Sequence, residues 1–356
     1  MMVDSVDGTS EGTVPGTAPR GCARPLHEVY DTALLDLDGV VYAGGEAVPH
    51  AVDSLRAARK AGMRLAYVTN NAARTPETVA AHLSRLGVAA EPGEVVTSAQ
   101  AVARLMSEQL PAGARVLCAG GEGLRVALAE RGLRPVDSAD DEPAAVVQGY
   151  GGPELPWGVI AEAAIAVNRG VPWFASNTDL TIPSGRGIVP GNGAAVEAVR
   201  IASGGRVEPQ VAGKPRPPMH RESILRTGAR RPLVVGDRLD TDIEGAHAGG
   251  VDSLLVMTGV TDVAQLLVAR PDHRPTYVAA DLRGLLAPHP EVRAAADGGG
   301  WHCGGWRAFV AGDELRLQGE GAPIDGLRAL CGAAWSTGRP WRGEGPWREG
   351  LEGAWG

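Results

Sequence analysis

The stretch ALLDLDG, residues 33–39, is the most informative part of the sequence, because an apolar run ends there in two acids and a glycine. Short apolar runs of this kind are typical of buried parallel strands. Six more runs follow along the chain, at residues 65–68, 116–118, 144–147, 173–175, 233–235 and 254–256. Helical patterns separate these runs. The alternation predicts an α/β fold built on a parallel sheet.

The helical segments carry recognisable start and stop signals. Thr75, Pro76 and Glu77 supply a cap residue, a first-position proline and an early acid, and Gly87 follows the last apolar residue, Leu86. These signals predict one helix between Pro76 and Leu86. Similar patterns predict further helices at residues 50–61, 98–110, 122–131, 158–168, 192–203 and 261–270.

Composition excludes several classes of protein. The 34 basic and 42 acidic residues leave a net charge of −8, which argues against a nucleic-acid partner. No apolar run approaches the roughly 20 residues of a membrane span, so we expect no membrane association. The four cysteines form no CxxC pair. They predict reduced thiols in a cytoplasmic protein and no cysteine metal site.

The 356 residues are enough for two or three domains. Residues 1–24 are rich in Gly, Ser, Thr and Pro and lack apolar periodicity, so we predict a disordered tail. The composition changes near residue 288, and we expect residues 289–356 to form a small C-terminal extension. Its pattern predicts two strands around residues 311–313 and a helix over residues 324–335.

Acidic residues follow two of the apolar runs. Asp36 and Asp38 are two residues apart, so in an extended strand both carboxylates point to the same side. Two such charges need a proton or a cation between them. Asp237 and Asp242 follow a later run, and together the four carboxyl groups would suit Mg²⁺. The simpler alternatives are a solvated Asp-Gly turn and acids at a helix start.

Lys214 is informative because the chain holds 32 arginines and two lysines, the other being Lys60. A compact ammonium at this loop position suits contact with phosphate or carboxylate oxygens, although chance could also place it there. Thr69, Asn70 and Asn71 follow the second apolar run. Their simpler interpretation is a turn. Taken together with the acids, these residues compose a site for phosphoryl transfer.

Four segments in this order resemble the motifs of the haloacid dehalogenase superfamily: DLDG (36–39), TNN (69–71), GKP (213–215) and GDRLDTD (236–242). The segments VTSAQ (96–100), ASNTD (175–179) and PGNGA (190–194) resemble the type IIA subgroup, which carries a large inserted cap. The resemblance implies a Rossmann-like parallel-sheet core formed by residues 25–95 and 210–288. It also implies an inserted α/β cap domain at residues 96–209, with the C-terminal extension as an α+β appendage.

The resemblance implies a role for each motif residue. Asp36 would attack phosphorus and become an aspartyl phosphate, and Asp38 would protonate the leaving alkoxide and later activate water. Mg²⁺ would bind Asp36, Asp237 and the backbone carbonyl of Asp38, with Asp242 as a further ligand or orienting group. The phosphoryl oxygens would be held by Thr69, Asn70, Asn71 and Lys214. In the cap, Asn177 and Asp179 would contribute to substrate choice, although an Asx turn is an equal alternative.

The implied activity is a Mg²⁺-dependent phosphatase acting on a small phosphorylated metabolite. Glycerol 3-phosphate is favoured, because the Arg- and Ala-rich composition and the C-terminal extension are similar to those of actinobacterial glycerol 3-phosphate phosphatases. Phosphoglycolate, sugar phosphates or nucleotides are alternative substrates, and a homo-oligomer is possible. A regulatory binding protein that uses its extension is a second hypothesis. Two further protein classes are disfavoured. A response-regulator receiver domain is far shorter than this chain. A dinucleotide-binding motif would need a third glycine after Gly121 and Gly123, but that position is Val126.

Overall fold

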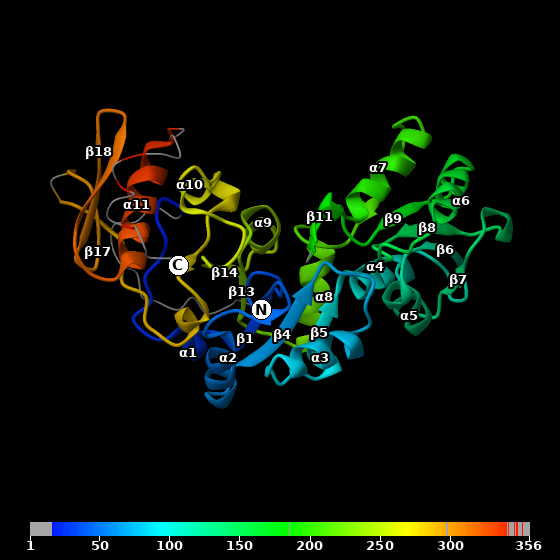
Figure 1. The fold of residues 1–356 in the computed structure, drawn as a ribbon, viewed down its shortest axis with the longest axis horizontal. Coiled ribbons are helices and arrows are strands. Elements are labelled where there is room, and N and C mark those ends of the chain that lie inside the picture. Colours follow the sequence, from blue (N-terminus) through cyan, green and yellow to red (C-terminus); the bar gives the residue numbers. More distant parts are fainter. Residues whose placement is uncertain are drawn as a thin grey trace, which may run out of the picture.

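In the computed structural model, residues 16–351 are described, except residues 185, 297, 340, 342–344, 346 and 348–350. A central parallel sheet lies between a second parallel sheet and an antiparallel sheet, so the molecule is elongated (Figure 1). The parallel sheets confirm the predicted α/β class. Residues 1–15 of the predicted tail and residues 352–356 of the extension lie outside the described residues.

The central sheet has six strands, all parallel to their neighbours. Their order is β15 (Tyr277–Ala279), β14 (Asp252–Val256), β13 (Pro232–Gly236), β1 (Thr32–Leu35), β4 (Arg64–Thr69) and β5 (Val95–Thr97). Leu35 of β1 lies opposite Val235 on one side and Tyr67 on the other. The chain therefore leaves β1, β4 and β13 at the same edge of the sheet, where ligands bind in open α/β folds.

Apolar side chains cover both faces of this sheet. Leu35 packs into one buried cluster and Leu34 into another, as the alternation of a strand requires. The surrounding helices are α1 (Leu26–Val29), α2 (Ala51–Lys60), α3 (Pro76–Arg85), α8 (Pro217–Thr227), α9 (Glu244–Ala248) and α10 (Val263–Leu267). The Thr75 side chain caps α3 by accepting from the Thr78 backbone N–H at 3.3 Å, as predicted. Helix α10 is shorter than predicted at both ends: the Asp262 side chain caps its start, and Val268 is its C-cap.

The inserted segment forms a second sheet, also parallel. Its order is β12 (Gln210–Val211), β9 (Trp173–Ala175), β8 (Ala145–Gln148), β6 (Arg115–Ala119) and β7 (Arg134–Val136). Around it lie α5 (Glu122–Glu130), α6 (Trp157–Asn168), α7 (Asn192–Ala202) and the hairpin β10 (Thr181–Ser184) and β11 (Gly187–Pro190). A smaller hairpin, β2 (Tyr42–Ala43) with β3 (Glu46–Ala47), follows β1.

Helix α4 (Ser98–Ser107) joins the two parallel sheets, and one apolar cluster runs from Val68 of the central sheet to Phe174 of the inserted sheet. Beside it, the Glu222 carboxylate is fully buried and pairs with three arginines. The partners are Arg104 of α4, Arg131 at 3.2 Å and Arg226 at 2.5 Å. The central region and the inserted region are therefore packed together over a continuous interior.

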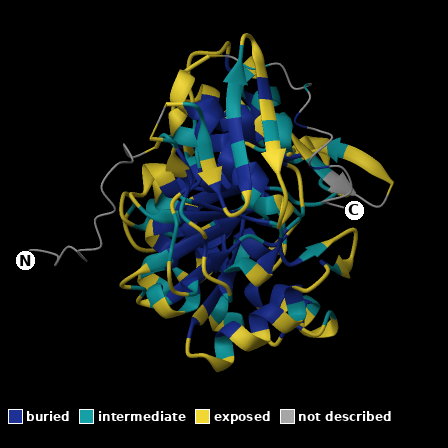
Figure 2. Cartoon of the chain, turned by 90° about the vertical axis from the view of Figure 1, so that its left-hand side faces the viewer, coloured by how far each residue is buried: buried dark blue, intermediate teal, exposed yellow. Residues whose placement is uncertain are grey.

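The C-terminal region is an antiparallel sheet covered by one helix, formed by β16 (Arg293–Ala294), β17 (Trp301–Cys303), β18 (Trp306–Ala311), β19 (Glu314–Gly319) and α11 (Pro323–Thr337). Figure 2 shows the outer face of this sheet in yellow and teal, with buried residues behind it. The buried Arg328 guanidinium of α11 donates to the Val278 carbonyl of edge strand β15, at 2.6 and 2.9 Å. Trp335 Nε1 donates to the Leu266 carbonyl at 3.0 Å.

Residues 16–24 differ from the predicted tail. The backbone N–H of Arg20 donates to the Thr276 carbonyl, and that of Cys22 to the His289 carbonyl, both at 2.8 Å. Ala18 is buried. Backbone hydrogen bonds need no apolar pattern, so the sequence held no signal for this attachment.

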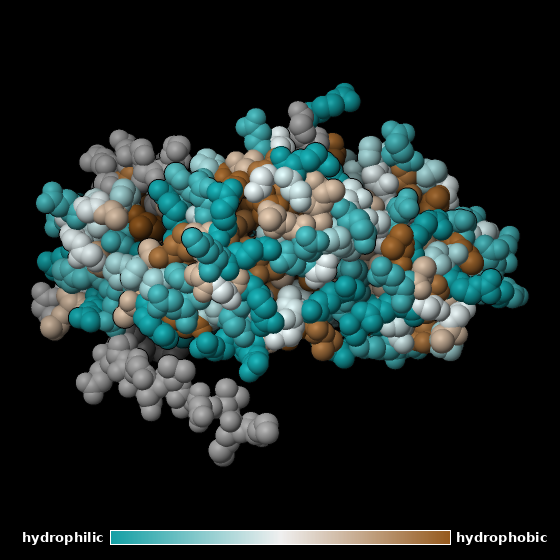
Figure 3. Space-filling model, turned by 90° about the horizontal axis from the view of Figure 1, so that it is seen from below, coloured by the Kyte–Doolittle hydropathy of each residue, from teal (hydrophilic) through white to brown (hydrophobic). Residues whose placement is uncertain are grey.

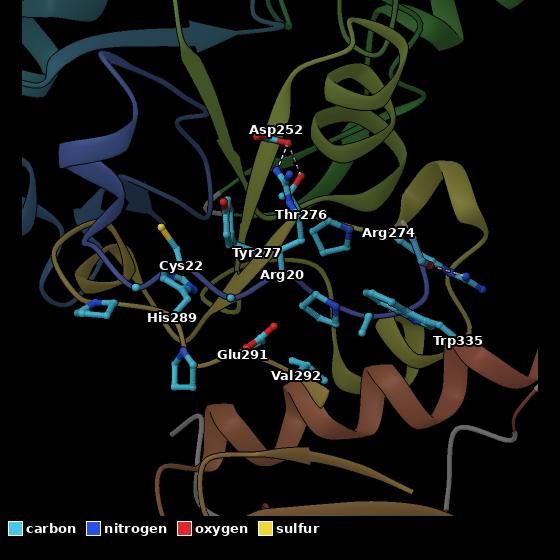
Figure 4. Close-up of a pocket in the computed structure, with 18 of the residues that line it drawn as sticks. Arg20, Cys22, Asp252, Arg274, Thr276, Tyr277, His289, Glu291, Val292 and Trp335 are labelled. Atoms are coloured by element: carbon cyan, nitrogen blue, oxygen red, sulfur yellow. Dashed lines mark hydrogen bonds and ion pairs between the residues drawn. The ribbon is translucent and has the colours of Figure 1, made fainter. Parts of the chain in front are cut away.

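A cavity of about 980 Å³ surrounds this segment, between β15 and α11 (Figure 4). None of the candidate site residues lines it. Its charged groups have partners: Arg20 forms an ion pair with Asp252, and the Arg274 guanidinium lies over the Trp335 ring at 5.3 Å. These residues form part of the interface between the central region and the C-terminal region.

Membrane-spanning helices and the state of the cysteines can be examined in the described residues. No helix in the described part of the chain is both long and apolar enough to cross a membrane. Seen from below, brown side chains are scattered among hydrophilic ones (Figure 3). Cys22, Cys118, Cys303 and Cys331 are all free thiols.

Candidate active site

Three of the predicted residues meet directly at the edge of the central sheet. The Lys214 ammonium donates to Asp36 Oδ1 at 2.5 Å and to Asp242 Oδ1 at 2.7 Å. The Lys214 side chain is 6% exposed and that of Asp36 13%. A third Lys214 donor reaches the Val68 carbonyl at 3.4 Å. The only lysine outside a helix therefore lies between two carboxylates that come from distant parts of the chain.

Asp237 completes an acidic cluster beside this pair. Asp36, Asp237 and Asp242 each place one carboxylate oxygen within 4.8 Å of the others. Asp237 Oδ2 accepts from the Val260 backbone N–H at 2.7 Å, whereas the buried Oδ1 has no protein partner. A buried carboxylate oxygen without a hydrogen bond is costly, and a cation satisfies it. The donor set of carboxylate oxygens fits Mg²⁺.

The electrostatics of the cluster follow from this crowding. Burial raises the pKa of Asp36 well above its usual range, and Asp242 and Asp237 add to the rise, while Lys214 opposes it. Burial, with Asp242, also raises the pKa of Asp237, to about 6. Burial alone would lower the pKa of Lys214, but the carboxylates of Asp242 and Asp36 outweigh it and raise that pKa. The cluster is therefore short of positive charge, as a cation site should be.

Two glycines leave room for the Asp237 carboxylate. A Cβ atom at Gly259 would lie 1.9 Å from Asp237 Oδ2, and one at Gly39 would lie 2.5 Å from it. Gly39 also has φ of 81°, which a side chain would strain. The backbone at Gly259 and Gly39 therefore lies so close to the Asp237 carboxylate that a side chain at either position would overlap it.

We predict that Gly259→Ala displaces Asp237. The added methyl cannot fit, so the loop or the carboxylate must move, at a cost of ~1–3 kcal/mol. Phosphatase activity and the melting temperature should both fall. Gly158→Ala on α6 is the matched control, because nothing lies within 4 Å of its added Cβ. Normal activity of Gly259→Ala at normal Mg²⁺ concentration would contradict the close-approach argument.

Asp38 lies at the open side of the cluster. Its side chain keeps solvent access, and Tyr42 of the β2 hairpin donates a long hydrogen bond of 3.5 Å to Oδ2. Desolvation by the surrounding protein nevertheless raises the pKa of Asp38, with Lys214 and Arg74 opposing the rise. A carboxyl group with a raised pKa and access to substrate is suited to proton transfer.

The three residues after β4 take different positions. Thr69 is buried, and its hydroxyl oxygen accepts from the Asn71 backbone N–H at 3.1 Å. Asn71 Oδ1 accepts from the Ala73 backbone N–H at 2.9 Å, so its side chain caps the loop. Asn70 Oδ1 accepts from the Lys214 backbone N–H at 2.8 Å, and Nδ2 donates to the Lys214 carbonyl at 3.1 Å. The Asn70 side chain thus holds the Lys214 loop instead of pointing to an open phosphate site.

The inserted region reaches the same point through the loop after β9. Asn177 Nδ2 donates to the Asn70 carbonyl at 2.7 Å. Asn70 Nδ2 donates to both Asp179 oxygens, at 3.1 and 3.3 Å. Burial raises the pKa of Asp179, while Asn70 opposes the rise. The predicted specificity residues therefore lie within one hydrogen bond of the predicted catalytic loops.

Comparison with known proteins agrees with this geometry. The model of the haloacid dehalogenase-like hydrolases matches residues 33–134, and that of the HAD-hydrolase-like proteins matches residues 211–285. The D-glycerol 3-phosphate phosphatase of Mycobacterium tuberculosis is 44% identical over 320 residues, 88% of each chain. The chain belongs to the haloacid dehalogenase-like hydrolase family.

Other relatives of this haloacid dehalogenase-like hydrolase are also phosphatases. The acid sugar phosphatase of Staphylococcus aureus is 37% identical over 260 residues, which cover 72% of this chain and 97% of the relative. A crystal structure of the M. tuberculosis glycerol phosphate phosphatase in complex with magnesium has a TM-score of 0.82 and 42% identity. The match covers 93% of this chain and 99% of that one.

The C-terminal region of the hydrolase has a match of its own. Residues 303–351 match the GCN5-related N-acetyltransferase like domain. The predicted strands around residues 311–313 and the predicted helix over residues 324–335 correspond to β18, β19 and α11.

Sequence reasoning also missed Tyr42, Gly259 and the buried His220. The available signal for Gly259 was its position, because a glycine shortly after a strand end allows close approach of another group. The positions of Tyr42 and His220 depend on packing and had no signal.

Proposed function

We propose that this protein is a Mg²⁺-dependent phosphatase that hydrolyses glycerol 3-phosphate through an aspartyl-phosphate intermediate. The observation that carries the proposal is the Asp36 carboxylate, held by the Lys214 ammonium at 2.5 Å beside Asp237 with its unpartnered buried oxygen. A positioned carboxylate, a lysine and a cation-binding cluster are the parts that phosphoryl transfer requires.

The residues that would hold Mg²⁺ are Asp36 and Asp237, with the Asp38 carbonyl and Asp242 as further candidates. When bound, the cation would offset negative charge on the transferring phosphoryl group. In this structure Asp242 uses Oδ1 for Lys214 and Oδ2 for the Arg238 backbone N–H at 3.2 Å. Asp242 therefore supports the proposal mainly as a group that orients Lys214.

In the first step, a carboxylate oxygen of Asp36 forms a bond to phosphorus and the ester P–O bond breaks. Asp38 gives its proton to the leaving alkoxide oxygen, so the alcohol departs neutral. In the second step, Asp38 takes a proton from water, the water oxygen bonds to phosphorus, and the acyl-phosphate bond breaks. Inorganic phosphate leaves, and both carboxyl groups return to their first states.

Lys214 and Thr69 are the proposed ligands of the phosphoryl oxygens. Lys214 Nζ is fixed by two carboxylates, and the Thr69 hydroxyl proton is left for a ligand because its oxygen accepts from the backbone. Fixed donors stabilise developing charge without reorganising. The backbone N–H of Asn70 would serve better than the side chains of Asn70 and Asn71, which are committed to the loops.

Glycerol 3-phosphate is the substrate we favour among the alternatives. Two relatives are named for phosphates of polyhydroxy compounds, glycerol and sugars. Asp179 would accept hydrogen bonds from such hydroxyl groups, since Asn70 holds it near the phosphoryl site. Asn177 would fix this loop by its bond to the Asn70 carbonyl. A cytoplasmic location and a possible homo-oligomer belong to the same proposal.

A substrate panel with the Asp179→Asn variant tests this assignment. The wild-type protein with Mg²⁺ should show its highest kcat/KM for glycerol 3-phosphate, above phosphoglycolate, a nucleoside monophosphate and a sugar phosphate. Asp179→Asn should raise KM for glycerol 3-phosphate about tenfold, the value of one or two lost hydrogen bonds. It should affect p-nitrophenyl phosphate little, because that leaving group has no hydroxyl.

Asp140→Asn is the matched control, since this exposed acid lies elsewhere in the inserted region. A preference for phosphoglycolate, or equal effects of Asp179→Asn on both substrates, would reject the assignment.

A further inference from the structure

A buried histidine lies beneath the catalytic cluster and has no role in the mechanism above. His220 of α8 is 6% exposed, and its Nε2 is buried without a protein hydrogen-bond partner. The ring packs against α9, where a Cβ at Gly245 would lie 2.8 Å from Nε2 and one at Gly249 would lie 3.4 Å from the ring. A polar ring atom in an interior normally has a partner, so its unpaired state needs an explanation.

The same place holds a small enclosed cavity. Its volume of about 10 Å³ is the space of one water molecule. The polar residues that line it are Asp36, Lys214, His220, Ser223 and Asp242. Apolar side chains close its walls, and the polar groups converge from α8 and from the catalytic cluster.

The Lys214 ammonium uses its three donors within the protein, and the longest contact, to the Val68 carbonyl at 3.4 Å, is the one that a phosphoryl oxygen would replace when substrate binds. Its donors go to Asp36, Asp242 and the Val68 carbonyl. The carboxylates keep acceptor capacity, since each oxygen has two lone pairs. The Ser223 hydroxyl donates to the Met219 carbonyl at 2.9 Å and can still accept. A water molecule in the cavity would therefore have a histidine nitrogen, a hydroxyl and a carboxylate as partners, which is enough to hold it.

We propose that His220 is a positioning residue that supports the Asp36–Lys214–Asp242 cluster from below through one buried water molecule. The water accepts from or donates to Nε2 and donates to a carboxylate. This bond limits rotation of the carboxylate that Lys214 holds, and it leaves the substrate side of the cluster untouched. Burial, with Lys214 nearby, lowers the pKa of His220 to about 4, so the ring is neutral and adds no charge to the cluster.

The inference predicts a split between kcat and KM. His220→Phe keeps the ring shape and removes both nitrogens, so kcat should fall about tenfold through loss of alignment. KM should stay near the wild-type value, because substrate does not touch this side. The melting temperature should change little, since the ring keeps its packing and only one water-mediated contact is lost. His220→Gln restores a polar atom and should recover most of the lost kcat.

The assay uses the full chain with Mg²⁺ and p-nitrophenyl phosphate, with His247→Phe as control, because His247 is an exposed histidine of α9. Wild-type kcat in a folded His220→Phe variant would overturn the proposal. So would equal losses of kcat and melting temperature in both His220 variants, which would indicate a packing role only.

A high-resolution crystal structure of the wild-type protein supplies a test that needs no variant to fold. Density for a water between Nε2 and a carboxylate of the cluster is expected, and its absence would overturn the inference. The inference rests on the proposed phosphatase function. A wild-type protein that hydrolyses no phosphomonoester would reject that function, while the crystal structure would still decide whether the water is bound.

Discussion

Asp36→Asn is expected to abolish phosphate release. An amide is a very poor nucleophile, and loss of the attacking group lowers turnover by roughly a thousandfold or more in comparable covalent mechanisms. The fold should survive, because the side chains have the same shape and Lys214 keeps its bond to Asp242 at 2.7 Å. The melting temperature should stay close to that of the wild-type protein.

Two measurements check this prediction. Phosphate release is measured with Mg²⁺ and glycerol 3-phosphate, and acid-quenched protein is examined by mass spectrometry for covalent phosphate. Wild-type protein should carry phosphate on Asp36, and the variant should carry none. Asp53→Asn is the matched control, because this exposed acid on α2 pairs with Arg56 on the surface. Turnover by Asp36→Asn above a few percent of wild type would remove Asp36 from the nucleophile role.

Asp237→Asn is expected to abolish productive Mg²⁺ binding. Val260 N–H holds Oδ2 at 2.7 Å, so the asparagine carbonyl should take that place. Its NH₂ group would then replace the unpartnered Oδ1 and point a donor toward the cation. Loss of a ligand together with this repulsion should weaken Mg²⁺ binding by at least about 100-fold, more than the loss of a supporting contact.

Isothermal titration calorimetry and the Mg²⁺-induced rise in melting temperature measure this effect without turnover. The metal-free variant should be as stable as the metal-free wild type or more so, because one of three crowded carboxylates loses its charge. Only the wild type should gain stability from Mg²⁺. Asp240→Asn is the control, since that exposed acid pairs with Arg238. Equal Mg²⁺ affinities of Asp237→Asn and wild type would rule out this site.

The same residue predicts a pH dependence. Burial and Asp242 raise the pKa of Asp237 to about 6 in the metal-free protein, so protons compete with Mg²⁺ below that pH. The apparent Mg²⁺ affinity of the wild type should therefore fall as pH drops through 6. A Mg²⁺ affinity that is constant between pH 5 and 7 would contradict this prediction, because about one proton should bind Asp237 when Mg²⁺ leaves.

Much of the fold could be predicted, because strands and helices are marked locally. The apolar runs around Leu34 and Val234 became neighbouring strands, and Thr75 capped its helix. The attachment of residues 16–24 could not be predicted, since it uses backbone groups whose partners, Thr276 and His289, are about 260 residues away. Backbone hydrogen bonding leaves no mark on side-chain pattern.

The site shows the same division. The scarcity of lysine singled out Lys214, and its contact with Asp36 spans 178 positions in the sequence. Asn70 was predicted to bind phosphate with its neighbours, but its side chain is occupied by the Lys214 backbone and Asp179. An amide can serve either purpose, so residue type could not decide between them.

The residue types and their order were enough to show which chemical groups are available: carboxyl groups, a hydroxyl and one lysine, each placed where a strand or loop ends. These properties depend on residue type and on local periodicity, which a linear chain displays. The three-dimensional packing was needed to show which oxygen of Asp237 lacks a partner and that His220 and Lys214 line the same small cavity. Such facts depend on close packing between segments far apart in the chain, where a shift of one ångström changes which atoms meet.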